Sequence, residues 1–314
     1  MRRTPLLAVV VLLAAAVGLP SAGAVAKGEE RVLVVLATNG PRPYTVAEVQ
    51  QTAREIETFF QVSSFGQMKL HVDVTPWLSA FTTSPGCGGL TNESFEAVVA
   101  PARVAADRAG YHMARYDDAI YAIANVRCAF HGETWGREVM LTTQPNLQLA
   151  AHELGHTFGL GHAQASTCSA NPLGCARDGT GDPLSPMGEG AVDFSVYEKV
   201  TLGWIPAQPR VTAPGKYTVA VPTLQTKLRQ ALVVETEDGD WWIEYRSRPF
   251  RGLVVRWVDN LPRPAPFGTP SLLVMDPVKR GRPWIAKGQS YRLPGSFRVT
   301  LLRAGAAQAQ VRLR

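Results

Sequence analysis

The stretch that most constrains this chain is HELGHTFGLGH, residues 152 to 162, which holds three of the six histidines. His152 and His156 are four residues apart, so on an α-helix both rings lie on one face. Gly159 is where such a helix can end, since glycine readily adopts the left-handed conformation of a helix C-cap. The chain can then turn and bring His162 back toward the first two rings. The stretch therefore predicts three imidazoles that converge on one point.

The residue types in this stretch fit a catalytic metal site. Three neutral imidazoles with a fourth position open to water are the ligand set of a catalytic zinc. Glu153, beside the first histidine, can reach that water and act as a general base. The alternative is an ordinary helix with surface histidines and a glycine C-cap. The five positions that match one motif favour the metal site.

A second signal is the segment SPMGEG, which places Met187 in a tight turn after the histidines. Taken alone, such a methionine is more often an ordinary core residue. The pattern His-Glu-x-x-His-x-x-Gly-x-x-His followed by this turn resembles the metzincin metallopeptidases, in which the turn forms an apolar floor beneath the zinc. The resemblance implies that His152, His156 and His162 bind one catalytic Zn²⁺. It also implies that Met187 and Gly159 support the site.

Residues 181 to 205 indicate a more specific family within this group. Their sequence, GDPLSPMGEGAVDFSVYEKVTLGWI, is similar to the gametolysin (autolysin) peptidases, which combine Gly-Asp and Met-Gly with a helix ending in Leu-Gly-Trp. WWIEYR, residues 241 to 246, is similar to the strand that opens the β-rich C-terminal region of such proteins. The likeness is specific from about Leu149 to Trp204 and diffuse elsewhere.

The resemblance implies a secreted zinc metalloendopeptidase. Its substrate would be a protein or peptide, with cell-wall or extracellular glycoproteins among the candidates. Two alternatives stay open: a zinc amidase directed at the cell wall, and a wall- or glycan-binding protein that retains a metal site. Glu153 argues against the binding protein, because a purely structural metal site does not need that carboxylate.

Residues 1 to 26 are predicted to be a signal peptide. Met1-Arg2-Arg3 is basic, Leu6 to Leu19 is apolar, and Ala24-Val25-Ala26 forms an Ala-x-Ala cleavage pattern. The alternative is a membrane anchor, for which the apolar run is short. We therefore expect a mature protein that is secreted or held in the cell envelope, without stable membrane insertion.

The four cysteines are an even number in a chain that is expected to be exported, which indicates two disulfides. Three pairings are possible. We favour Cys168–Cys175, which closes a short loop, and Cys87–Cys128, which ties a long loop to a strand. The alternative is free buried thiols.

The distribution of charge along the chain argues against nucleic acid as a partner. Its formal net charge is +6, but no run of Lys or Arg resembles a nucleic-acid-binding stripe. We expect a monomer that binds no nucleic acid.

Hydrophobic periodicity predicts two domains. The resemblance implies that residues 27–205 form an α/β (α+β) metzincin-like catalytic domain, with a twisted mixed sheet and an active-site helix at 148–158. Residues 206–314 alternate strands and turns and are expected to form an all-β, sandwich-like domain. Expected strands of the first domain are 31–39, 68–76, 118–126 and 137–143; its other expected helices are 45–60, 95–108 and 193–203.

Residues 137–143 are expected to be the edge strand beside the active-site helix, where an extended peptide can add as a further strand. Other polar residues have a structural interpretation that we favour. His131 and Glu133 are interpreted as a polar turn rather than as cleft residues, and Tyr197 as helix packing rather than as a ligand. The loop with Asp178 and Asp182 is interpreted as an Asx-turn, with a structural Ca²⁺ as the alternative.

Overall fold

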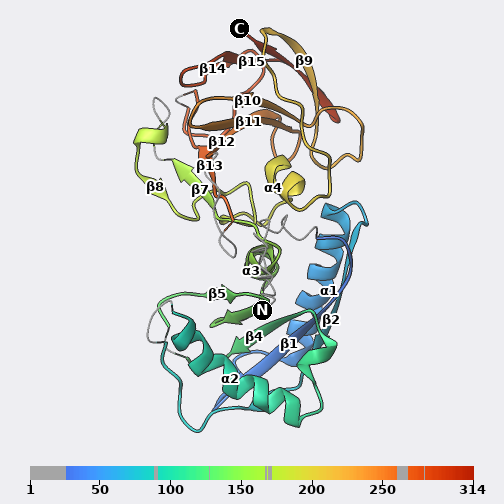
Figure 1. The fold of residues 1–314 in the computed structure, drawn as a ribbon, viewed down its shortest axis with the longest axis vertical. Helices are drawn as coiled ribbons and strands as arrows, with labels where there is room; N and C mark the ends of the chain where they lie inside the picture. The colour runs from blue at the N-terminus through green and yellow to red at the C-terminus, as the bar shows by residue number, and fades with distance from the viewer. Residues whose placement is uncertain are drawn as a thin grey trace, which may run out of the picture.

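The computed structural model describes residues 26–87, 91–126, 128–166, 168, 172–259, 268–278 and 280–314. The predicted signal peptide, apart from Ala26, lies outside the described residues. Figure 1 shows a lower part, in which helices pack on a sheet, and an upper part built of β-sheets, with helix α3 (Leu147–Thr157) between them. Within the described ranges, no helix is both long and apolar enough to cross a membrane.

The lower sheet has the strand order β2–β1–β4–β6–β5, with β3 beside the end of β1. Its strands are β1 (Gly28–Thr38), β2 (Met68–Val74), β3 (Leu78–Ser79), β4 (Asp118–Ile123), β5 (Gly132–Trp135) and β6 (Glu138–Leu141). Pairing is parallel except between β5 and β6, which are antiparallel. The predicted α/β part with a mixed sheet is confirmed.

Helices cover both faces of this sheet. Helix α1 (Val46–Ser63) packs with α3 on one face, and α2 (Asn92–Arg108) packs on the other. All residues of β4 are buried, as expected for a central strand that is covered on both faces. Helix α1 begins at a capping box, in which the Thr45 hydroxyl and the Glu48 carboxylate each accept a backbone N–H.

The prediction that residues 137–143 form the edge of the sheet is wrong. Strand β6 lies between β4 and β5, so the edge beside α3 is β5. The two strands form a hairpin in which Trp135 pairs with Glu138 across a two-residue turn. Gly136 in that turn has a φ of 61°, which glycine adopts without strain. A four-residue strand with two polar residues in its centre has the composition of a loop, which explains the error.

The upper part contains two sheets that share one apolar core. The first has the order β10–β11–β12–β13–β7–β8 and the second has the order β14–β15–β16–β9. Their strands are β7 (Ala163–Ser166), β8 (Arg177–Asp178), β9 (Gly215–Ala220), β10 (Ala231–Glu235), β11 (Gly239–Arg246), β12 (Gly252–Asp259), β13 (Ser271–Val274), β14 (Ser290–Arg292), β15 (Arg298–Ala304) and β16 (Gln308–Leu313). Strands β7 and β8 precede residue 206, so the first sheet takes strands from both sides of the predicted domain boundary.

Helix α4 (Val196–Thr201) is shorter than the predicted helix at 193–203. Its start is set by Ser195, whose hydroxyl accepts a hydrogen bond from the Glu198 N–H, while the Glu198 carboxylate accepts one from the Ser195 N–H. The helix stops before Gly203, which has a φ of 73°. A capping box that begins at Ser195, the third residue of the predicted segment, therefore excludes residues 193–195 from the helix.

Both predicted disulfides, Cys87–Cys128 and Cys168–Cys175, are present. Disulfides of this kind persist in oxidising environments outside the cytosol.

A buried group of charged residues connects the upper sheet to the segment that carries Met187. Arg256 of β12 lies between Asp182 and Glu244, with N–O distances of 2.8 Å to each carboxylate. Arg246 of β11 donates to the same oxygen of Glu244 at 2.7 Å. All four side chains are less than a tenth exposed. An unpaired charge inside a protein costs free energy. Removing one of these four charges would therefore leave a buried partner unpaired and destabilise the fold.

Acid is expected to weaken the fold through Glu244. Burial opposes ionisation of its carboxyl, but Arg246 and Arg256 outweigh burial and lower its pKa from 4.5 to about 2. Ionised Glu244 therefore stabilises the folded state above about pH 4.5, and this contribution is lost as the pH falls toward 2. In urea unfolding over this pH range, Glu244→Gln should show a flatter decline than wild type. The exposed Glu235→Gln is the control, and parallel curves for wild type and Glu244→Gln would contradict the assignment.

Candidate metal centre

The three motif histidines converge, as the sequence predicts. His152 and His156 lie one turn apart on α3, which the Asn146 side chain caps at its N-terminus. Gly159, with a φ of 86°, lets the chain reverse after the helix, and His162 follows directly before β7. The ring centroids are 4.8, 4.8 and 5.2 Å apart, and one nitrogen from each ring lies within 4.8 Å of the others. This group can hold a metal ion.

Backbone carbonyls select the tautomer of two of these rings. His152 Nδ1 lies 2.9 Å from the Pro186 oxygen, and His156 Nδ1 lies 2.8 Å from the Leu160 oxygen. A carbonyl can only accept, so each neutral ring carries its proton on Nδ1 and leaves Nε2 bare. The two Nε2 atoms are 3.2 Å apart. Two lone pairs at that distance repel each other unless a cation lies between them.

The spacing of the nitrogens also fits a metal ion. Metal–nitrogen bonds of about 2.0–2.1 Å in tetrahedral geometry place two ligand nitrogens about 3.3 Å apart. The distance of 3.2 Å between the Nε2 atoms of His152 and His156 agrees with this value.

The rings are also in the protonation state that a metal needs. Burial, with the neighbouring imidazoles adding to it, lowers the pKa of His152 to about 4 and that of His156 to about 3. Burial lowers the pKa of His162 as well. The imidazoles are therefore neutral at pH 7 and can bind a cation without first losing a proton.

Glu153 lies against β5 rather than free in solvent. It is 4% exposed, and Thr134 Oγ1 donates to its Oε2 at 2.6 Å. Burial raises the pKa of Glu153 to about 7, although the Thr134 hydrogen bond opposes the shift. A Cβ at Gly132 would lie 2.3 Å from Oε1, so only glycine at this position leaves room for the carboxylate. Thr134 and Gly132 are site residues that the sequence analysis missed.

Met187 packs against α3 at Gly155. It is fully buried, and a Cβ at Gly155 would lie 2.2 Å from its sulfur. The glycine therefore lets the helix rest directly on the thioether. The Met187 N–H donates to Ser185 Oγ at 3.0 Å, which holds the turn.

The histidines and Glu153 line a cleft of about 550 Å³ between β5 and the loop before α4. The other residues of its wall are Phe130, His131, Gly132, Glu133, Thr134, Trp135, Gln148, Leu149, Thr180, Gly188 and Glu189. Both His131 and Glu133 therefore line the cleft. The interpretation as a polar turn is wrong for Glu133, which lies in β5, whereas His131 lies in the bend before that strand. Tyr197 is packing, as predicted: its ring contacts Trp242 and its hydroxyl donates to the Thr269 carbonyl.

The Asp178 loop forms the predicted Asx-turn, with the Thr180 N–H 3.3 Å from Asp178 Oδ1. Asp182 is fully buried and binds Arg256 instead of facing that loop.

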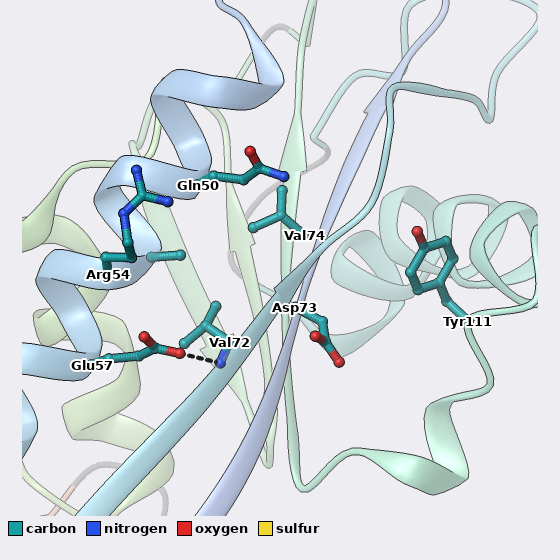
Figure 2. Close-up of a pocket in the computed structure, with 8 residues that line it drawn as sticks. Gln50, Arg54, Glu57, Val72, Asp73, Val74 and Tyr111 are labelled. Carbon is teal, nitrogen blue, oxygen red and sulfur yellow. Dashed lines mark hydrogen bonds between the residues drawn. The ribbon is translucent and has the colours of Figure 1, made fainter.

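A second hollow, shown in Figure 2, lies between α1 and β2 and contains none of these groups. Its wall includes Glu57, whose carboxylate accepts a hydrogen bond of 2.8 Å from the Val72 N–H of β2. Glu57 thereby covers part of the free edge of β2. Because Glu57 lies outside the cleft, substitution of its carboxylate can serve as a control for substitution of Glu153.

Comparisons with known proteins add little to this description. No protein-family model and no curated protein sequence matches the chain. A solved structure described as a chaperone–substrate complex is similar at 14% identity and a TM-score of 0.33, over 54% of this chain and 29% of that chain. A likeness this weak carries no argument about function, so the site must be interpreted from its own geometry.

Proposed function

We propose that this protein is a secreted zinc metalloendopeptidase, with His152, His156 and His162 as the zinc ligands. The observation that carries the proposal is the pair of bare Nε2 atoms 3.2 Å apart at the wall of an open cleft. Imidazole suits zinc, and three imidazoles without a thiolate are typical of a catalytic rather than a structural zinc site. Secretion agrees with the two disulfides.

Zinc in this position would supply a Lewis acid that activates water at neutral pH and polarises the carbonyl of the bond to be cleaved. Glu153 is the general base: its carboxylate accepts the proton of the attacking water and passes it to the departing amine. Thr134 orients that carboxylate through the 2.6 Å hydrogen bond to Oε2. The Pro186 and Leu160 carbonyls keep Nε2 of the two helical histidines free for the metal.

The edge of β5 supports an extended peptide as the substrate. The Thr142 N–H donates to the His131 carbonyl, so the backbone carbonyl of His131 points toward the strand that continues into β6. Alternation along an antiparallel strand then directs the backbone N–H and C=O of Gly132 and Thr134 away from β6. A peptide that adds to this edge would run along the cleft beside Glu153. The opposite edge of the sheet is less available, because Glu57 occupies part of β2.

The test is cleavage of a mixed peptide library by the purified mature chain, read by mass spectrometry with and without a zinc chelator. We expect cleavage that the chelator abolishes and added zinc restores. Zinc binding without cleavage of any peptide would contradict the endopeptidase and favour a wall amidase. Cleavage that resists the chelator would contradict the metal mechanism.

A further inference from the structure

Strands of the upper part hold the third histidine in place. Strand β13 pairs in parallel with β7, which begins directly after His162. The Ser271 N–H donates to the His162 carbonyl at 3.1 Å. Figure 1 shows the two strands side by side above α3. The lower α/β part therefore does not set the position of His162 alone.

Arg256 makes a second connection, to the segment 182–188 that carries Met187. Its Nε donates to Asp182 Oδ2 at 2.8 Å and its Nη2 donates to the Leu184 carbonyl at 3.1 Å. The third nitrogen, Nη1, donates to Glu244 Oε1 of β11 at 2.8 Å. The side chain is 2% exposed. One guanidinium thus joins the upper sheet to two residues, Asp182 and Leu184, at the start of the turn 182–188.

That turn contacts the metal centre on two sides. The Pro186 carbonyl accepts the hydrogen bond from His152 Nδ1, and Met187 supports α3 at Gly155. The Ala163 N–H, next to His162, donates to the Met187 carbonyl at 2.8 Å. A shift of the turn would therefore move the Pro186 carbonyl, which holds the His152 ring. It would also move Ala163, which is next to His162.

Only arginine can make these three bonds at once. The guanidinium is planar and offers donors in several fixed directions, whereas lysine places one compact charge at the end of a flexible chain. Lysine at position 256 can stay near one carboxylate but cannot also reach the Leu184 carbonyl in the same geometry. The turn would then lose its bond at Leu184, two residues before Pro186, whose carbonyl accepts from His152.

We propose that Arg256 is a positioning residue of the metal centre, which fixes the turn 182–188 so that the Pro186 carbonyl orients His152 for the metal. The proposal rests on the zinc site proposed above. It makes the upper β-sheet a part of the metal centre, although Arg256 touches neither metal ligands nor substrate.

The test is the dissociation constant for Zn²⁺ of the full chain, measured by competition with a chelator, together with the visible spectrum of the Co²⁺ form. Arg256→Lys is expected to raise this constant about 10-fold to 100-fold, the effect typical of losing a group that orients a ligand. The Co²⁺ spectrum should change with it. The matched control is Arg246→Lys, since Arg246 is equally buried and shares Glu244 but does not contact the turn. Its zinc affinity should change much less than that of Arg256→Lys.

Asp182→Asn is the second variant and decides the matter if Arg256→Lys does not fold. It keeps the volume and an oxygen for the Leu184 N–H but loses the ion pair with Arg256. A folded variant of either kind with wild-type zinc affinity would overturn the proposal. Peptide cleavage is not part of this measurement, so a wild type that binds zinc and cleaves nothing would refute the endopeptidase and leave the role of Arg256 intact.

Discussion

Glu153→Gln is expected to lower kcat/KM for peptide cleavage about 10³-fold while zinc remains bound, because a general base contributes about 10²–10⁴-fold. Glutamine fills the same space beside Gly132 and can still accept the hydrogen bond from Thr134. It cannot accept the proton of the attacking water. The measurement is steady-state cleavage of a peptide found in the library, with zinc content determined on the same samples.

The matched control is Glu57→Gln, which changes a carboxylate that also accepts one hydrogen bond but lies outside the cleft (Figure 2). It should leave both cleavage and zinc content at the wild-type level. If Glu153→Gln with full zinc content kept most of the wild-type activity, another group would have to take the proton, and the assigned mechanism would fail.

Zinc is expected to stabilise the fold, and His162→Ala is expected to remove that effect. Free zinc at 100 times its dissociation constant adds about 2.7 kcal/mol to the free energy of unfolding. For a chain of this size that corresponds to a rise of roughly 4–5 °C in Tm. His162 lies beyond the C-terminus of α3, so its loss removes a ligand without changing the helix. The measurement is thermal unfolding of the chelator-treated protein with and without added zinc.

His71→Ala is the control for this experiment. His71 is an exposed residue of β2 whose Nε2 lies 3.7 Å from Glu29, far from the cleft in sequence and in structure. Its variant should keep the full zinc-dependent rise in Tm. A His162→Ala protein that retained the same rise would show that zinc binds elsewhere, and the ligand assignment would have to be abandoned.

The candidate site could be predicted where its signal is local in the sequence. A spacing of four residues on a helix and a glycine at its end are enough to bring His152, His156 and His162 together, because helix geometry leaves little freedom over one turn. The expectation that Met187 belongs to the site came from a resemblance rather than from spacing. The carbonyls of Pro186 and Leu160 could not be predicted, since a backbone acceptor has no residue type that marks it.

The errors in the fold arise where pairing is not local. Strand β5 is short and polar at its centre, so its composition matches a turn, and only its pairing with β6 shows that it is a strand. Strand β7 pairs with β13, which lies more than 100 residues later in the chain. Neither sequence contains a feature that indicates its pairing partner. The role of Arg256 was hidden for the same reason: a single arginine in a β-strand gives no hint that it reaches the turn at Asp182.

The parallel pairing of β7 with β13 also bears on when the protein can become active. A chain made from its N-terminus produces α3 and its two histidines long before it produces Ser271, whose N–H holds the carbonyl of His162. Contacts between distant segments form late, because the intervening chain must first be closed into a loop. The third histidine therefore reaches its final place only after most of the chain has been made and has folded. On the proposed function, this order would keep the metal centre incomplete until Ser271 has been made and has paired with the segment at His162.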